Sequence, residues 1–201
     1  LKAADFLVKS IFGNLTPLGG GEDDTPGLKL FETSDLFGPA DAWFKPLDEA
    51  QGSFDMMGIT LGAWKRGKGF THALKDKAEA GCKIRVLLMD RENPCLPHLI
   101  NEHIPEVNLG DVLHDVDSMF SFFSRLSEEC KNIEVRRIQQ GCPHFQLTRT
   151  DARAMFVQYL YSQKPGWSPM WSTPADTPLY NTLAEEFEFL WECNPSGQGR
   201  K

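Results

Sequence analysis

The stretch Cys142–Asp151, with the sequence CPHFQLTRTD, leads directly into the largely apolar run Ala152–Tyr161. This pattern is typical of a strand, a turn and a second strand. Because side chains on a strand alternate between its two faces, we expect His144 and Gln146 to share one face while Phe145 packs on the other. An imidazole beside a hydrogen-bonding side chain is suited to attack on a phosphodiester, so the stretch predicts a candidate site as well as part of a sheet.

The spacing from His144 through Gln146 to Asp151 is H-x-Q-x-x-x-x-D. It resembles the H-x-K-x-x-x-x-D signature of the phospholipase D superfamily, which contains phospholipases, nucleases and phosphatidyl transferases. Gln146 stands where the family pattern has lysine. In the family's logic one imidazole attacks phosphorus and a second protonates the leaving oxygen, while the aspartate orients a histidine. The resemblance therefore implies catalytic roles for all three residues.

The resemblance extends beyond the motif itself. The segment Phe70–Asp90, a helix followed by an Ala-Gly-Cys turn and a strand, resembles the family's elements upstream of the motif, and Pro178–Trp191 resembles its closing helix. The resemblance covers roughly Phe54–Trp191. The implied fold is α/β, a mixed β-sheet flanked by helices in a single-motif phospholipase D-like domain.

Hydrophobic patterning predicts the elements of this sheet. Five strands are expected, over Ser53–Leu61, Lys83–Met89, Ile133–Ile138, Phe145–Thr148 and Ala154–Tyr161. Helices are expected over 39–52, Phe70–Ala80 and Asn108–Lys131, and from Pro178 after a threonine N-cap. A helix between the first two strands makes a βαβ unit, so these strands should run parallel. Apolar residues recur at helical spacing in Asn108–Lys131 and predict that one face of this helix packs in the core. These residues are Val112, Val116, Met119, Phe120, Phe123 and Leu126.

A chain of 201 residues with 41% hydrophobic content is long enough for one α/β domain, which we place at 39–194. Residues 1–38 are expected to form an amphipathic helix and a flexible acidic glycine-rich segment, and 195–201 a disordered tail. The start at Leu1 suggests a piece of a longer protein. Neither a secretory signal nor a membrane span is recognisable.

The net charge of −7 argues against a protein that wraps many phosphates, whereas binding of a nucleotide or a single phosphodiester stays open. The five cysteines are odd in number and scattered, which favours a reducing compartment and a cytoplasmic protein. Cys95, His98, His103 and Cys142 lack the paired spacing of structural zinc sites. We therefore expect no metal and no cofactor.

Further residues are expected near His144. The basic turn formed by Lys65, Arg66 and Lys68 precedes a helix, whose N-terminus favours anions. Arg149, Arg153 or this basic turn are candidates to replace the missing lysine charge, although Arg149, three positions from Gln146 on a strand, faces the other side unless the turn comes early. The resemblance also implies that Ser168, and Glu186 or its neighbour Glu185, approach the site. Of these, Lys65, Arg66, Lys68, Arg149, Ser168 and Glu186 form the predicted substrate-binding group.

One motif per chain has a consequence for assembly. The resemblance implies two histidines in a complete site, and His72, His98, His103 and His114 lack the motif spacing. A homodimer that brings two motifs together across a two-fold axis is therefore expected.

Two functions follow from these residues. The first is a phospholipase D-like phosphodiesterase, of the nuclease or nucleotide class rather than a lipase, with activity lowered by Gln146. The second is an inactive phosphodiester-binding or nucleotide-binding domain that regulates, or provides an interaction surface in, a larger protein.

Overall fold

The computed structural model describes residues 27–31, 45–65, 67, 69–103, 108–159 and 168–196. The expected helix over 1–12, the glycine-rich segment before Gly27 and the start of the helix at 39 lie outside these residues. So does the end of the expected strand at Tyr161.

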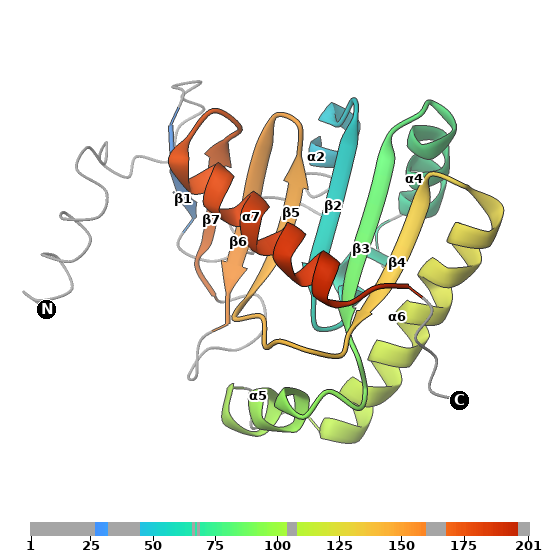
Figure 1. Ribbon diagram of the computed structural model, residues 1–201, viewed down its shortest axis with the longest axis vertical. Helices are drawn as coiled ribbons and strands as arrows, with labels where there is room; N and C mark the ends of the chain where they lie inside the picture. Colours follow the sequence, from blue (N-terminus) through green and yellow to red (C-terminus); the bar gives the residue numbers. More distant parts are fainter. Residues whose placement is uncertain are drawn as a thin grey trace, which may run out of the picture.

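The described residues build one seven-stranded sheet with the order β1-β7-β6-β5-β2-β3-β4 (Figure 1). Strands β2, β3 and β4 run parallel, and all other neighbouring pairs are antiparallel. The predicted mixed sheet and the parallel βαβ pair are thus confirmed. The strands are β1 (Lys29–Phe31), β2 (Ser53–Gly58), β3 (Lys83–Met89), β4 (Ile133–Ile138), β5 (Phe145–Thr150), β6 (Arg153–Gln158) and β7 (Met170–Pro174).

Strands β3 and β4 have the predicted bounds, while the others differ at their ends. Strand β2 ends at Gly58 because the chain turns at Leu61, whose φ is 53°. Strand β5 continues to Thr150 because it pairs with both β2 and β6. Strands β1 and β7 were not predicted. Both are short, and Pro169 just before β7 and Pro174 at its end obscure the strand signal of β7.

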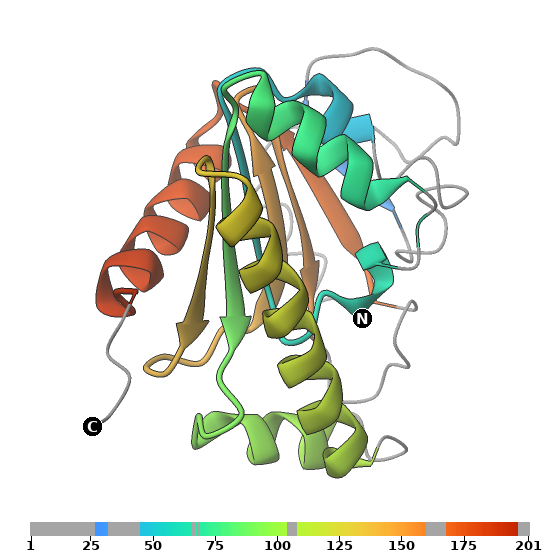
Figure 2. The ribbon, with the colours of Figure 1, turned by 90° about the vertical axis from the view of Figure 1, so that its right-hand side faces the viewer.

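Helices cover both faces of the sheet (Figure 2). Helices α4 and α6 lie on one face, and α7 crosses the other (Figures 1 and 2). The side chain of Asn108 caps α6 by accepting a hydrogen bond from the Gly110 amide, and Thr177 caps α7 as predicted. The described helices are α2 (Lys45–Glu49), α3 (Gly62–Lys65), α4 (Phe70–Glu79), α5 (Cys95–His103), α6 (Leu109–Glu129) and α7 (Pro178–Cys193).

Alternation along the strands divides the core into two clusters. Phe54 and Met56 pack with α4 and α6, whereas Met57 and Leu147 pack beneath α7. In α6, Phe122 is buried, and the predicted core residue Phe120 is only half-buried because its ring lies against Arg137. None of the described helices is long and apolar enough to cross a membrane.

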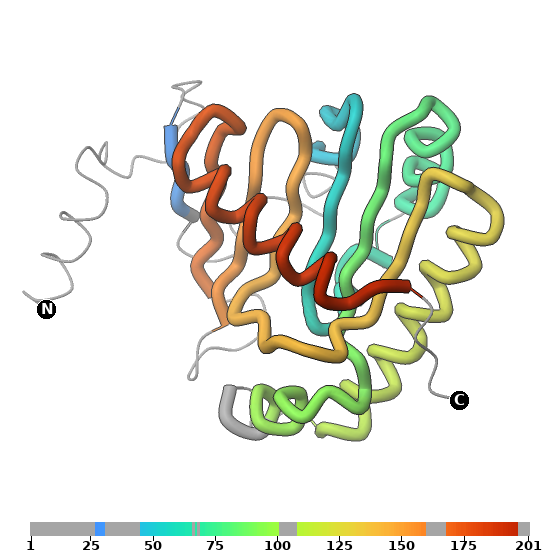
Figure 3. The backbone as a smooth tube through the Cα atoms, in the orientation of Figure 1, coloured from blue at the N-terminus to red at the C-terminus, as the bar shows by residue number. Residues whose placement is uncertain are grey.

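The chain from β4 to β5 runs back along one edge of the sheet. Figure 3 traces it from the end of β4 past the ends of β3 and β2. At Gly141 the φ is +98°, and a Cβ there would lie 2.7 Å from Cδ2 of Leu190. Glycine is therefore needed for both the turn and the close approach to α7. This loop delivers His144 to the carboxyl edge of the parallel strands.

Candidate functional site

The carboxyl ends of β2, β3 and β4 meet the start of β5 at this edge. Ligands of open α/β sheets bind outside the carboxyl ends of parallel strands, where backbone and loop groups converge. His144 immediately precedes β5 and is exposed. Its carbonyl oxygen accepts a hydrogen bond of 2.9 Å from the Tyr159 amide, which continues the β5–β6 ladder by one residue.

Gln146 lies beside the last residue of β2. Met57 pairs with Leu147, so Gly58 is the next residue opposite Gln146. A Cβ on Gly58 would lie 3.3 Å from Cγ of Gln146 and 2.8 Å from Cδ2 of Leu61. The glycine thus makes room for both side chains. Leu61 is buried, and its backbone adopts the left-handed conformation. This conformation costs a residue with a Cβ about 1–3 kcal/mol and is found most often near functional sites.

Tyr159 completes this corner and was missed by the sequence reasoning. Its hydroxyl oxygen accepts a 3.2 Å hydrogen bond from the Ile59 amide, so the side chain links β6 to the end of β2. Burial raises the pKa of Tyr159. The phenol therefore stays protonated and is a neutral neighbour of the candidate site. Tyr159 could have been placed near His144 only by pairing the two strands correctly, and the sequence alone does not give that register.

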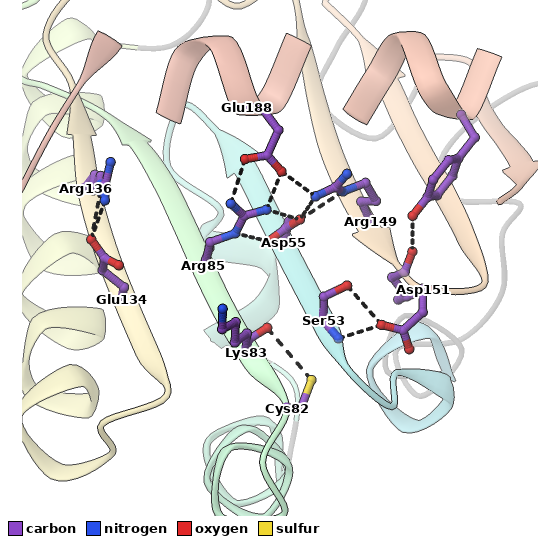
Figure 4. Close-up of polar contacts among 12 residues, drawn as sticks. Ser53, Asp55, Cys82, Lys83, Arg85, Glu134, Arg136, Arg149, Asp151 and Glu188 are labelled. Carbon is purple, nitrogen blue, oxygen red and sulfur yellow. Dashed lines mark hydrogen bonds and ion pairs between the residues drawn. The ribbon is translucent and has the colours of Figure 1, made fainter. Parts of the chain in front are cut away.

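Asp151 does not orient His144 within the chain, contrary to the predicted role. The two residues flank opposite ends of β5, which a strand rise of about 3.3 Å per residue places roughly 20 Å apart. The Asp151 carboxylate instead accepts hydrogen bonds from the amides of Gln51 and Gly52, at 2.7 and 3.0 Å, and from the amide and hydroxyl of Ser53 (Figure 4). The aspartate thereby fastens the β5–β6 hairpin to the start of β2.

The amides around Asp151 make stability depend on pH. Partial burial raises the pKa of Asp151, but the hydrogen bonds from residues 51–53 outweigh it and leave the pKa below its ordinary value. The stabilisation is present above the unfolded pKa of about 4 and is lost as pH falls through the lower folded value. We expect Asp151→Ala to cost about 1–2 kcal/mol at pH 7, because its partial exposure weakens charged hydrogen bonds.

Urea unfolding at pH 7 and near pH 3 measures this effect. The difference between wild type and Asp151→Ala should shrink at the lower pH. Asp115→Ala, which removes an exposed carboxylate from α6, is the matched control and should change stability by less than about 0.5 kcal/mol. An equal cost for Asp151→Ala at both pH values would contradict the assignment.

Arg149 points to the opposite face from Gln146, which corrects its predicted role as a replacement cation. Asp55 is opposite Arg85 on β3 and opposite Arg149 on β5, so opposite charges alternate across neighbouring strands. Both guanidinium groups donate to the fully buried Asp55, with Nε to oxygen distances of 2.8 Å. Glu188 of α7 accepts from both arginines, at 2.7 to 2.9 Å (Figure 4).

This cluster of Asp55, Arg85, Arg149 and Glu188 joins the sheet to α7. The hydrogen bonds from Arg85 lower the pKa of Glu188 and outweigh its partial burial. The Arg85 guanidinium also lies 4.8 Å from the centre of the Phe187 ring. With two positive and two negative groups, the cluster balances its own charge. A single charged residue in an otherwise apolar strand, such as Asp55 in β2, is the sequence signal that indicates such a cluster.

The other predicted binding residues are dispersed. The Lys65 ammonium lies 3.4 Å from the Ser118 hydroxyl and 5.6 Å from the centre of the Phe122 ring, both on α6. Ser168 is buried just before β7, at the same edge as His144 but two strands away. Glu186 is exposed on α7, across the sheet from Gln146. The remaining two members of the predicted group, Arg66 and Lys68, lie outside the described residues.

In the part of the chain that the structure describes, no group of three or more histidine, cysteine or acidic side chains is placed to hold a metal ion. At the carboxyl edge of the sheet, His144 supplies an exposed imidazole and Gln146 a carboxamide.

Neither a protein-family model nor a curated protein sequence matches this chain. Its fold does match solved structures. Nuc from Salmonella typhimurium, a phospholipase D family member, is 13% identical, with a TM-score of 0.51 over 85% of this chain and 97% of that one. Phosphatidylserine synthase from Haemophilus influenzae Rd KW20 is 10% identical, with a TM-score of 0.55 over 84% of this chain and 39% of the synthase.

A third similar structure is TrmBL2, an archaeal chromatin protein that binds DNA. It is 14% identical, with a TM-score of 0.56, and the match covers 98% of this chain. The chain spans 62% of the length of TrmBL2. At these identities the comparisons establish the fold alone, and the fold is the predicted phospholipase D-like α/β sheet.

Proposed function

We propose that the chain is a phospholipase D-like domain that binds a phosphodiester ligand, of nucleotide or nucleic-acid type, around His144 and Gln146, with little turnover. The expectation of low turnover rests on one observation. Arg149, the nearest predicted substitute for the missing lysine, is held by Asp55 and Glu188 on the other face of the sheet. Gln146 supplies hydrogen bonds to phosphoryl oxygens without the positive charge that a lysine would bring.

The arrangement around His144 supports binding. His144 is exposed at the carboxyl edge, and Gln146 is positioned by Gly58 on the face that the strand alternation predicts for both residues. An imidazole and an amide can donate to two oxygens of one phosphodiester. A single phosphate group suits the net charge of −7 better than an extended duplex does.

A phosphodiesterase is the second candidate function. The exposure of His144 favours it, because a second copy of the chain could approach the imidazole across a two-fold axis. A homodimer would then supply the two histidines that the family resemblance implies.

The fold shared with TrmBL2 bears on the ligand class. That protein binds DNA, and this chain matches only part of its length. The match supports a regulatory domain of a larger protein, by analogy of fold rather than by any shared site. Nucleotides and nucleic-acid ends are therefore the first ligands to test.

Histidine NMR during titration with bis-p-nitrophenyl phosphate tests binding. The His144 ring signal should shift at millimolar ligand, whereas the exposed His72 and His114, on α4 and α6, should not. Gln146→Ala should weaken binding about two- to tenfold, the value of one hydrogen bond. An unperturbed His144 would contradict the proposal.

Gln158→Ala is the matched control for that titration. Gln158 is an exposed glutamine on the neighbouring strand and pairs with Phe145, so it belongs to the other face. Its removal should leave the affinity unchanged. Equal effects of the two variants would show that the shift does not report a site at Gln146.

A further inference from the structure

Two thiols meet beside the loop that carries His144. Cys95 is the first residue of α5, Cys142 lies two residues before His144, and both are half-buried against the cluster beneath α7. The Cys142 thiol lies close enough to Cys95 for the two side chains to interact. Both cysteines are free in the structure.

Asn93 holds the two segments together. Its side-chain amide donates to the carbonyl of Gly141 at 3.0 Å and to that of Ile138 at 2.8 Å, while its carbonyl oxygen accepts from the Cys95 amide at 2.9 Å. Asn93 is itself buried. One side chain thus holds the backbone at Cys95 close to the backbone just before Cys142.

The two cysteines are not equivalent chemically. Burial, together with the hydrogen bond to Cys95, raises the pKa of the Cys142 thiol to about 11. Cys142 is therefore protonated at neutral pH and donates its hydrogen towards the Cys95 sulfur. Cys95, the first residue of α5, is the partner that would accept this hydrogen. This asymmetry suits attack by Cys95 and resolution by Cys142.

We propose that Cys95 and Cys142 form a redox-sensitive pair that hydroperoxides convert to a disulfide. The Cys95 thiolate attacks a peroxide oxygen and becomes a sulfenic acid, while the O–O bond breaks and hydroxide leaves. The Cys142 sulfur then attacks the sulfenic sulfur, loses its proton and expels water. For hydrogen peroxide, two thiols and one peroxide give one disulfide and two waters. A dithiol reductant reverses the reaction.

The disulfide would tie the first turn of α5 to the loop before β5. Because Cys142 lies two residues before His144, oxidation would restrict the imidazole. Its effect on phosphodiester binding rests on the proposed function, whereas formation of the disulfide does not.

Peptide mapping by mass spectrometry tests the pair in the full chain. Native protein is treated with hydrogen peroxide at neutral pH, alkylated and digested. The expected result is a linked peptide containing Cys95 and Cys142 that disappears after dithiothreitol. Cys193→Ser, which removes the exposed cysteine of α7, should form the same link. Cys95→Ser and Cys142→Ser should each lose it, with circular dichroism confirming the fold.

Two outcomes would overturn the proposal. One is the absence of the linked peptide in wild type while Cys193 becomes oxidised. The other is a link that forms only after the fold is lost. The His144 NMR signal, compared with that of His72 in the reduced and oxidised proteins, then reports the effect on the loop. A link without any phosphodiester binding would separate failure of the proposed function from failure of this inference.

Discussion

Gln146→Lys is expected to raise phosphodiesterase activity by roughly 10²–10³. A lysine in this position restores a positive charge to the phosphoryl oxygens as charge develops in the transition state. The site has room for an unbranched side chain there, because Gly58 lacks the Cβ that would approach Cγ of residue 146. Release of nitrophenol from bis-p-nitrophenyl phosphate measures the gain.

Three controls accompany this variant. His144→Ala in the Gln146→Lys background should abolish the gained activity, since it removes the proposed nucleophile. Gln158→Lys adds the same charge on the other face of the sheet and should gain nothing. If two motifs share one site, specific activity should fall on dilution as a homodimer dissociates, and sedimentation over the same concentrations should show a monomer appearing.

The outcomes distinguish the two candidate functions. Wild-type turnover that is lost in His144→Ala identifies an enzyme that tolerates glutamine. Turnover that appears only with Gln146→Lys identifies a binding domain with a retained phosphodiesterase framework. If every variant is inactive and correctly folded, these residues do not form a hydrolytic site.

Removal of Asp55 should have the largest effect on stability, about 3–5 kcal/mol in the free energy of unfolding. Asp55 is fully buried and accepts from both Arg85 and Arg149. Asp55→Ala therefore leaves two guanidinium groups beneath α7 with only Glu188 as a carboxylate partner. Urea unfolding at pH 7 measures the loss.

A double-mutant cycle separates charge pairing from general damage. Arg149→Met combined with Asp55→Ala should cost less than the sum of the two single changes, because the remaining Arg85 and Glu188 balance each other. Glu134→Ala, which removes a half-buried partner of Arg136, should cost at most about 1 kcal/mol. Additive costs in the cycle would show that the buried cluster is not coupled.

Much of the sheet was predictable because its signals are local. Strand β3 was predicted at its observed bounds from a run of apolar residues, β4 from alternating apolar and charged residues, and α7 from its threonine cap and apolar face. The two faces of β5 followed from alternation alone. These elements depend on periodicity and capping, which neighbouring residues encode.

The missed features depend on register between distant strands. Asp151 was expected at a histidine, but the amides of residues 51–53 provide stronger partners that only pairing of β5 with β2 brings near. Alternation along β5 already points Arg149 away from Gln146, and only the same pairing reveals that its partner is Asp55. No spacing within one segment reveals which strand will lie beside it.

The position of β2 also decides whether the domain can be divided. Asp55 is 30 positions from Arg85 and 94 from Arg149, so β2 joins an early-completed parallel half to strands synthesised much later. A fragment ending before β5 would leave β2 as an unpaired edge with a half-neutralised Asp55, the kind of edge that recruits other chains. The entropic cost of closing so long a loop is offset only when both halves of the sheet are present to form contacts. We therefore expect the sheet to fold as one cooperative unit, and a chain cut between β4 and α7 to lose the native fold.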